Sequence, residues 1–101
     1  MKKIINKKMY DTETAKLLAS GRYSGSRDAY YFLEELYLKR TGEFFLYGEG
    51  APYSKYGEEV GQNCWTWGCD ITPLTEDDAM DWAEEYLDAD EYIKIFGEPA
   101  E

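Results

Sequence analysis

Short apolar runs separated by turn residues predict two β-hairpins in the first half of the chain. Residues 1–10 hold two runs with Asn6-Lys7 between them, a pair that suits a tight turn. Residues 30–38 and 43–47 hold two longer runs that are joined by a short Thr-Gly turn. We therefore expect one hairpin at each place.

The strand assignment of residues 30–38 competes with a helical one. In a strand, Glu34 shares one face with Phe32 and Leu36, whereas a helix would gather Phe32 and Leu36 in one apolar stripe. The aromatic residues favour a strand, while the sequence LEEL favours a helix. The run EFFLY that follows has little helical character, and a hairpin is the simplest connection to it. A strand is therefore predicted.

Between the two hairpins the apolar spacing changes to that of a helix. Asp11 or Thr12 can cap its first turn, because their side-chain oxygens accept hydrogen bonds from free backbone N–H groups. Leu18 would lie on the apolar face, and Gly21 can end the helix in a left-handed conformation. A loop over 22–28 is expected to follow.

The middle of the chain is rich in glycine and gives weaker signals. The sequence GEG at 48–50 predicts the end of the preceding strand, and Pro52 suits the first turn of a short helix over 51–58. Residues 60–70 are expected to be irregular or extended. Residues 71–74 predict an edge strand, because the proline within them lacks a backbone donor.

The clearest signals belong to the C-terminal part. Thr75 is a strong N-cap with Asp78 in the position of a capping-box acid, and a helical apolar stripe that includes Trp82 follows. Asp88 gives a second helix start, and Gly97 a stop. Two short helices that meet near 88–90 fit this pattern better than one long helix.

Taken together, these elements predict an α+β fold in one domain over residues 1–101. A small antiparallel sheet made of the two hairpins is packed by short helices, and the C-terminus is helical and acidic. The chain has 101 residues, of which 44% are hydrophobic. That length suits one core, and that fraction argues against a disordered tail.

The charge of the chain is strongly polarised. The net charge is −10, yet residues 1–40 hold 9 basic and 5 acidic side chains, while residues 41–101 hold 2 basic and 16 acidic ones. An acidic field repels nucleic acids and anionic membranes and attracts cationic protein surfaces. Direct binding of nucleic acid through the basic N-terminal part is therefore disfavoured. An acidic helix can also serve simply as a solvated face.

The acidic residues of the C-terminal helices suggest a more specific role. Asp77, Asp81 and Glu84 recur with helical spacing, and Asp88 continues the series, so they are expected to share one face about 16 Å long. Such a row resembles the phosphates of a duplex and could occupy a cationic groove built for nucleic acid. The candidate contact face consists of Asp77, Asp78, Asp81, Glu84, Glu85, Asp88, Asp90 and Glu91.

Aromatic side chains offer an alternative contact surface. Ten tyrosines cannot all fill a core of this size, so several should be exposed. Tyrosine and tryptophan provide large contact area at small entropic cost, which suits protein interfaces. Tyr53, Tyr56 and Trp65 are therefore candidate anchors in such an interface.

The sequence gives little support for catalysis or metal binding. It contains no histidine, which excludes imidazole bases and ligands, and no serine lies in a nucleophile or phosphate-loop motif. Paired carboxylates such as Glu34-Glu35 are not by themselves a catalytic pair. Cys64 and Cys69 are too few for a structural zinc site, although a local disulfide stays open. We expect a protein that is not an enzyme and that needs no cofactor or metal.

Three segments resemble a family of small, mostly uncharacterised acidic proteins from bacterial phages and mobile elements. They read YDTETAKLLASG at 10–21, GEFFLYGEGAPYSKYGE at 42–58 and ITPLTEDDAMDWAEEYL at 71–87. The resemblance implies a compact α+β domain and an anti-defence role, of which anti-CRISPR and anti-restriction proteins are examples. It transfers no functional residues, and the CWTWGC loop departs from the family pattern.

These expectations combine into one leading hypothesis. The protein would be an inhibitor, acting in the cytoplasm of a bacterial host, that binds a CRISPR–Cas effector or another nuclease at its cationic nucleic-acid site. The alternative is a protein-binding adaptor or regulator that uses its aromatic surface, with the carboxylates serving solubility only. The N-terminal sequence lacks the apolar run of a signal peptide, which fits the cytoplasmic expectation.

Overall fold

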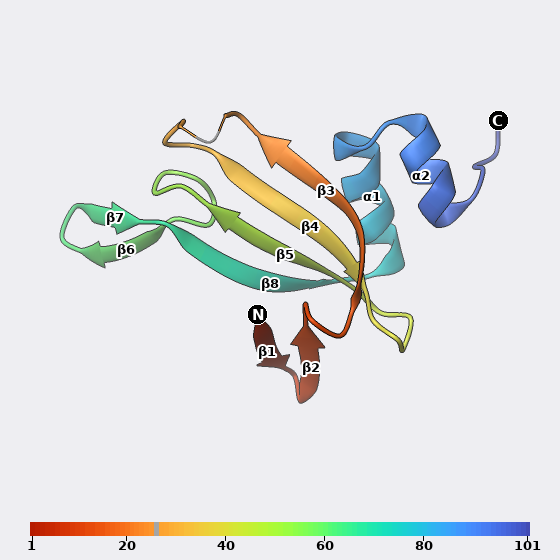
Figure 1. Cartoon of the computed structure of the whole chain (residues 1–101), viewed down its shortest axis with the longest axis horizontal. Coiled ribbons are helices and arrows are strands. Elements are labelled where there is room, and N and C mark those ends of the chain that lie inside the picture. The colour runs from red at the N-terminus through yellow and green to blue at the C-terminus, as the bar shows by residue number, and fades with distance from the viewer. Residues whose placement is uncertain (26) are drawn as a thin grey trace.

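The computed structural model describes residues 1–25 and 27–101 and confirms the α+β class. Its secondary structure consists of strands followed by two helices (Figure 1). The elements of the described residues are β1 (Lys2–Ile5), β2 (Lys8–Asp11), β3 (Lys16–Tyr23), β4 (Phe32–Leu38), β5 (Phe44–Gly50), β6 (Glu58–Gly61), β7 (Cys64–Thr66), β8 (Gly68–Leu74), α1 (Glu76–Tyr86) and α2 (Ala89–Phe96). Of the predicted loop at 22–28, Ser26 lies outside the described residues.

The central sheet has the strand order β3-β4-β5-β8, and all neighbouring strands are antiparallel. Its two central strands, β4 and β5, form the hairpin predicted at 30–47. The edge strand predicted at 71–74 is present as part of β8. The hairpin β6–β7 projects from one end of the sheet, and the helices lie at the other end (Figure 1). The N-terminal hairpin β1–β2 is confirmed but forms a separate sheet of its own.

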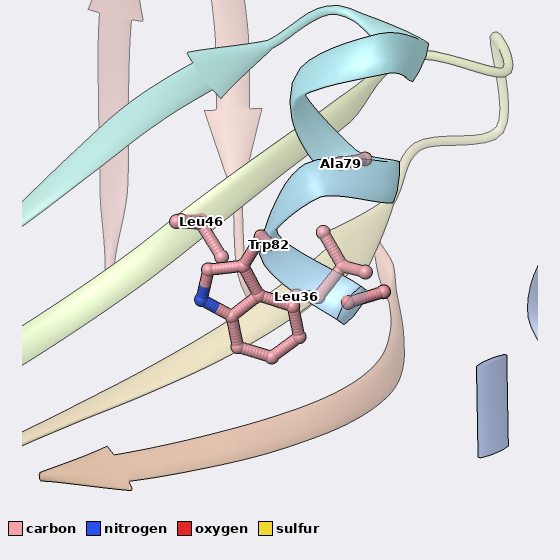
Figure 2. Packing of buried hydrophobic residues seen from close by; sticks show 5 residues of the cluster. Leu36, Leu46, Ala79 and Trp82 are labelled. Carbon is pink, nitrogen blue, oxygen red and sulfur yellow. The ribbon is translucent and has the colours of Figure 1, made fainter. Parts of the chain in front are cut away.

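Helix α1 packs on one face of the central sheet and forms the first core cluster. Leu36 and Leu46 are register partners on β4 and β5, and the Trp82 ring of α1 lies against them (Figure 2). Ala79 and Ala83 flank Trp82 and are fully buried, which lets the helix approach the sheet closely. Truncating one of the buried leucines to alanine would cost about 2–5 kcal/mol of stability.

The N-terminal hairpin covers part of the opposite face of the sheet. The rings of Tyr10 from β2 and Phe45 form a T-shaped pair at a centroid distance of 5.6 Å, and Tyr37 stacks on the same phenylalanine at 5.2 Å. Ile71 of β8 completes this second buried cluster. The middle of the sheet is thus covered on both faces, by the helix on one and by the hairpin on the other.

Local capping signals define both helices as predicted. Thr75 Oγ1 accepts a hydrogen bond from the Asp78 amide, and the Asp78 carboxylate accepts one from the Thr75 amide, which completes the capping box. Asp88 caps α2 by accepting from the Glu91 amide. Gly97 ends α2 with a φ of 87°, a conformation that favours glycine.

The helix predicted after Asp11 is wrong, because this segment forms β3. The Asp11 carboxylate does accept from a following amide, but that amide belongs to Glu13, two residues on, which makes a turn. Gly21 pairs with Glu34 of β4 and lies under Tyr86, where an added Cβ would come within 2.9 Å of the Tyr86 side chain. Pairing with β4 and packing under α1 therefore override the local helical pattern.

Gly48 does not end β5, which continues beyond the predicted break and has Gly50 as its last residue. An added Cβ on Gly48 would lie 1.9 Å from the Tyr56 ring, so this glycine permits close approach rather than a break. The helix predicted over 51–58 is also wrong. Two successive turns take its place, closed by the Ser54 amide on Ala51 O and the Gly57 amide on Ser54 O.

Candidate functional site

The acidic residues of α1 form a short row on one exposed face of the helix. Asp77, Asp81 and Glu84 follow one another at i, i+4 and i+7, a length of about 10 Å along the helix axis. The shared face of about 16 Å predicted from Asp77 to Asp88 is interrupted, because Asp88 lies beyond α1 and is the N-cap of α2. Helix α1 ends at Tyr86, and Leu87 is extended, with φ −111° and ψ 155°.

The acidic surface, which comprises the carboxylates of residues 76–91, is open to solvent and unneutralised. All of these side chains are exposed. In the described part of the chain none of them takes part in an ion pair; the ion pairs join Lys2 to Asp11, Lys3 to Asp70, Lys8 and Lys39 to Glu43, and Lys55 to Glu34. The members of the acidic surface are Glu76, Asp77, Asp78, Asp81, Glu84, Glu85, Asp88, Asp90 and Glu91.

Exposed aromatic side chains gather at the opposite end of the sheet from the helices. We call this the aromatic end, and its members are Tyr23, Tyr30, Tyr53, Trp65 and Trp67, which are 46–60% exposed. The rings of Tyr30 and Tyr53 meet at a centroid distance of 5.9 Å. The two candidate surfaces are therefore separate: one lies on the helices, and the other on the loops and the β6–β7 hairpin (Figure 1).

Tyr56 does not share the open position of Tyr53 and Trp65. Its ring is half-buried above Gly48, and its hydroxyl donates a hydrogen bond to the Glu34 carboxylate. Burial, followed by the hydrogen bond to Glu34, raises the pKa of the Tyr56 hydroxyl far above its usual value. Tyr56 therefore packs inside the protein and is not one of the exposed aromatic residues.

Glu34 is more deeply buried than Asp11, the other buried charged residue among those that the structure describes, and it was not among the predicted site residues. Its side chain is 1% exposed. One carboxylate oxygen accepts a hydrogen bond from the Trp82 indole at 3.0 Å. The other accepts a hydrogen bond from the Tyr56 hydroxyl and forms an ion pair with the Lys55 ammonium at 2.8 Å. The signal was present in the sequence: a charged residue on the apolar face of a strand needs buried partners.

The Glu34 cluster, made of Glu34, Lys55, Tyr56 and Trp82, lies beside an open cleft of about 700 Å³. Lys55 pairs with Glu34 there, and Lys3 pairs with Asp70. Hydrogen bonding to Lys3 lowers the pKa of Asp70. Since these charges are matched in pairs, and two hydrogen bonds and one ion pair hold Glu34, the arrangement is that of an internal clamp joining β4, the 51–57 loop and α1.

Reactive side chains outside this cluster are dispersed. Cys64 and Cys69 are free and exposed. Within residues 1–25 and 27–101, no three side chains of the metal-binding types gather closely enough to hold an ion. The same residues include no helix with the length and apolar character needed to cross a membrane.

Comparison with known proteins identifies no relative of the chain. No family model, no curated protein and no solved structure matches the chain.

Proposed function

We propose that the protein is a non-enzymatic inhibitor of a host nucleic-acid-handling defence complex, of the anti-CRISPR type. In this proposal the acidic surface occupies a cationic nucleic-acid-binding site on a CRISPR–Cas effector or another nuclease. The observation that carries it is the unneutralised state of the acidic surface. The chain holds nine carboxylates between residues 76 and 91, all of them exposed, and no basic residue in that stretch.

The contrast with the rest of the molecule supports this proposal. Several lysines elsewhere form ion pairs; Lys3, for example, pairs with Asp70, and Lys8 pairs with Glu43. A face that only needs to be soluble gains nothing from excluding lysine, because mixed charges at helical spacing stabilise a helix, whereas like charges at i, i+4 destabilise it. The acidic row therefore carries a stability cost that binding to a cationic surface can offset.

The spacing of the row also supports the proposed partner. The Cβ atoms of helical residues three or four positions apart lie roughly 5–6 Å apart. This spacing is of the same order as the axial distance of about 3.4 Å between charges along one nucleic-acid strand. A groove lined with lysine and arginine for a phosphate backbone could therefore pair with the row. Binding would exclude nucleic acid from the groove by direct competition.

The test begins with identification of the partner. The tagged protein is used to capture complexes from a bacterial host lysate at low salt, and the captured nuclease is purified and assayed for cleavage. We expect the wild-type chain to inhibit cleavage, and added DNA to compete with it. The triple variant Asp77→Lys/Asp81→Lys/Glu84→Lys should lose inhibition while keeping its fold.

A matched control changes the net charge equally at a distance from the helices. Glu13, Glu58 and Glu59 are exposed, so the variant Glu13→Lys/Glu58→Lys/Glu59→Lys should inhibit like the wild type. Inhibition retained by the helix variant, or lost equally in both variants, would refute occupation of the nucleic-acid site by the acidic surface.

A second candidate function rests on the aromatic end. Exposed tyrosine and tryptophan rings are typical anchors of protein interfaces, and Tyr53 and Trp65 are 60% and 46% exposed. The protein would then be an adaptor or regulator, and the carboxylates would serve solubility. The double variant Tyr53→Ala/Trp65→Ala should abolish capture of the partner in this case and should spare it in the first.

A further inference from the structure

A groove between the two helices adds an apolar element to the acidic surface. Its volume is about 410 Å³, and it lies where α1 ends and α2 begins. Its apolar lining comes from both helices and from the C-terminal segment, and Ile93 within it is 37% exposed. The residues that form this lining are Ala83, Leu87, Ala89, Tyr92, Ile93 and Pro99.

Two carboxylates of the acidic surface, from Glu84 and Asp88, complete the lining of this groove. Glu84 takes part in no ion pair within residues 1–25 and 27–101, and neither does Asp88, of which one oxygen accepts from the Glu91 amide. The lining contains no lysine or arginine. The groove therefore combines an apolar floor with uncompensated negative charge.

We propose that this groove binds an arginine side chain of the partner. The methylene stem would lie over Leu87 and Ile93, and the guanidinium would pair with the carboxylates of Glu84 and Asp88. Arginine fits this environment because its stem is apolar, and its weakly hydrated, forked head can donate to two carboxylates at once. The inference rests on the proposed function and names the place where the cationic partner is anchored.

The direct test uses a small probe on the full-length chain. Amide shifts are followed by NMR during titration with n-butylguanidinium, which reproduces the arginine side chain, and with guanidinium alone. We expect saturable shifts confined to residues 83–93 and the neighbourhood of Pro99. Butylguanidinium should bind at least about tenfold more tightly than guanidinium, because only the former buries methylene groups.

A groove-filling variant separates this proposal from general electrostatic attraction. Ala89→Trp fills the groove and keeps every carboxylate, and Ala29→Trp makes the same change at an exposed alanine remote from the helices. Ala89→Trp should abolish the butylguanidinium shifts and weaken partner binding at least about tenfold. Ala29→Trp should change neither. Ile93→Ser removes part of the floor instead and provides a second variant if Ala89→Trp fails to fold.

The outcomes of this experiment are distinct from those of the charge-reversal test. Equal binding of the two guanidinium probes, or unchanged butylguanidinium binding in both groove variants, would overturn the arginine site while leaving the proposed inhibition intact. Shifts in the groove that depend on protein concentration without any probe would also overturn it, because a second copy would then be the occupant. Saturable butylguanidinium binding to a chain that inhibits no nuclease would support the arginine site in the groove and refute the proposed inhibition.

Discussion

Glu34 shows how a single charged residue is accommodated inside a small core. Its carboxylate would be costly to bury alone, but Trp82 and Tyr56 donate hydrogen bonds to its two oxygens and Lys55 pairs with its charge. These three partners come from α1 and from the 51–57 loop, so the residue ties both to the centre of the sheet. The cluster therefore fixes the position of α1, on which much of the acidic surface is displayed.

We predict that Glu34→Gln lowers the free energy of unfolding by about 2–4 kcal/mol. The neutral amide carries no charge to pair with Lys55. Because glutamine keeps only one oxygen, its NH₂ group must face a hydrogen-bond donor, Trp82 or Tyr56, that a carboxylate oxygen meets in the wild type. Urea denaturation followed by tryptophan fluorescence measures the change. Glu59→Gln, at an exposed position on β6, is the control and should have little effect. Equal stabilities of the two variants would contradict the role assigned to Glu34.

At the scale of elements, Glu43 attaches the N-terminal hairpin to the central sheet. Its carboxylate pairs with Lys8 of β2 at 2.9 Å and with Lys39 at 3.2 Å, and it accepts a hydrogen bond from Thr41. The bond to Lys8, followed by those to Thr41 and Lys39, lowers the pKa of Glu43 from 4.5 to about 2. The hairpin is thereby linked to the turn between β4 and β5.

This link predicts a defined acid sensitivity. Because the pKa of Glu43 is lower in the folded state, its contribution to stability is complete above about 4.5 and is lost as the pH falls towards about 2. Side-chain NMR titration should give a pKa near 2 for Glu43. In Lys8→Met the pKa should rise towards 4.5, whereas Lys7→Met, at the neighbouring turn position, should leave it unchanged. A titration of Glu43 near 4.5 in the wild type would refute the link.

Replacing an aspartate by alanine should have opposite effects on stability at Asp81 of α1 and at Asp88, the N-cap of α2. Asp81 has acidic neighbours at i−4, i−3, i+3 and i+4 on α1, so Asp81→Ala should raise the free energy of unfolding by about 0.5 kcal/mol. Asp88 instead caps α2, and Asp88→Ala should lower it by about 1 kcal/mol. Urea denaturation of both variants measures the pair of changes. Destabilisation by Asp81→Ala would mean that the row carries no repulsive cost.

Sequence signals were sufficient where an element is defined by its own residues. The capping box at Thr75, the second cap at Asp88 and the Asn6-Lys7 turn all act within a few positions, and each predicted element is present. The predicted class of the fold follows from these local signals. The position of the carboxylates on the C-terminal helices was predictable for the same reason.

Elements that depend on distant partners were not predictable in this way. Gly21 resembled a helix stop because its neighbour Tyr86 lies 65 positions along the chain. Gly48 resembled a strand end because the Tyr56 ring that requires it belongs to a later loop. The partners of Glu34 likewise lie 21–48 positions away. Local pattern contains no information on such contacts.

At the scale of the whole molecule, the two candidate surfaces lie on opposite ends of an elongated shape measuring 49 × 32 × 20 Å (Figure 1). Each can therefore be altered without disturbing the other. Their physical chemistry also differs, because the acidic surface acts through charge, whereas the aromatic end acts through burial of apolar area. Dissolved salt screens the charge interactions of the acidic surface, with a Debye length of about 8 Å at physiological ionic strength. It leaves the burial of apolar area at the aromatic end nearly unchanged.

This difference gives the last prediction, which concerns the salt dependence of partner binding. If the acidic surface carries the interaction, affinity should fall at least about tenfold between roughly 0.05 and 0.5 M NaCl. Asp77→Lys/Asp81→Lys/Glu84→Lys should flatten that dependence, and Tyr53→Ala/Trp65→Ala should leave its slope unchanged. Calorimetry or surface binding assays at several salt concentrations provide the measurement. An affinity that is insensitive to salt in the wild type and is lost in the aromatic variant would instead assign binding to the aromatic end, and the carboxylates of α1 would then be a solvated face.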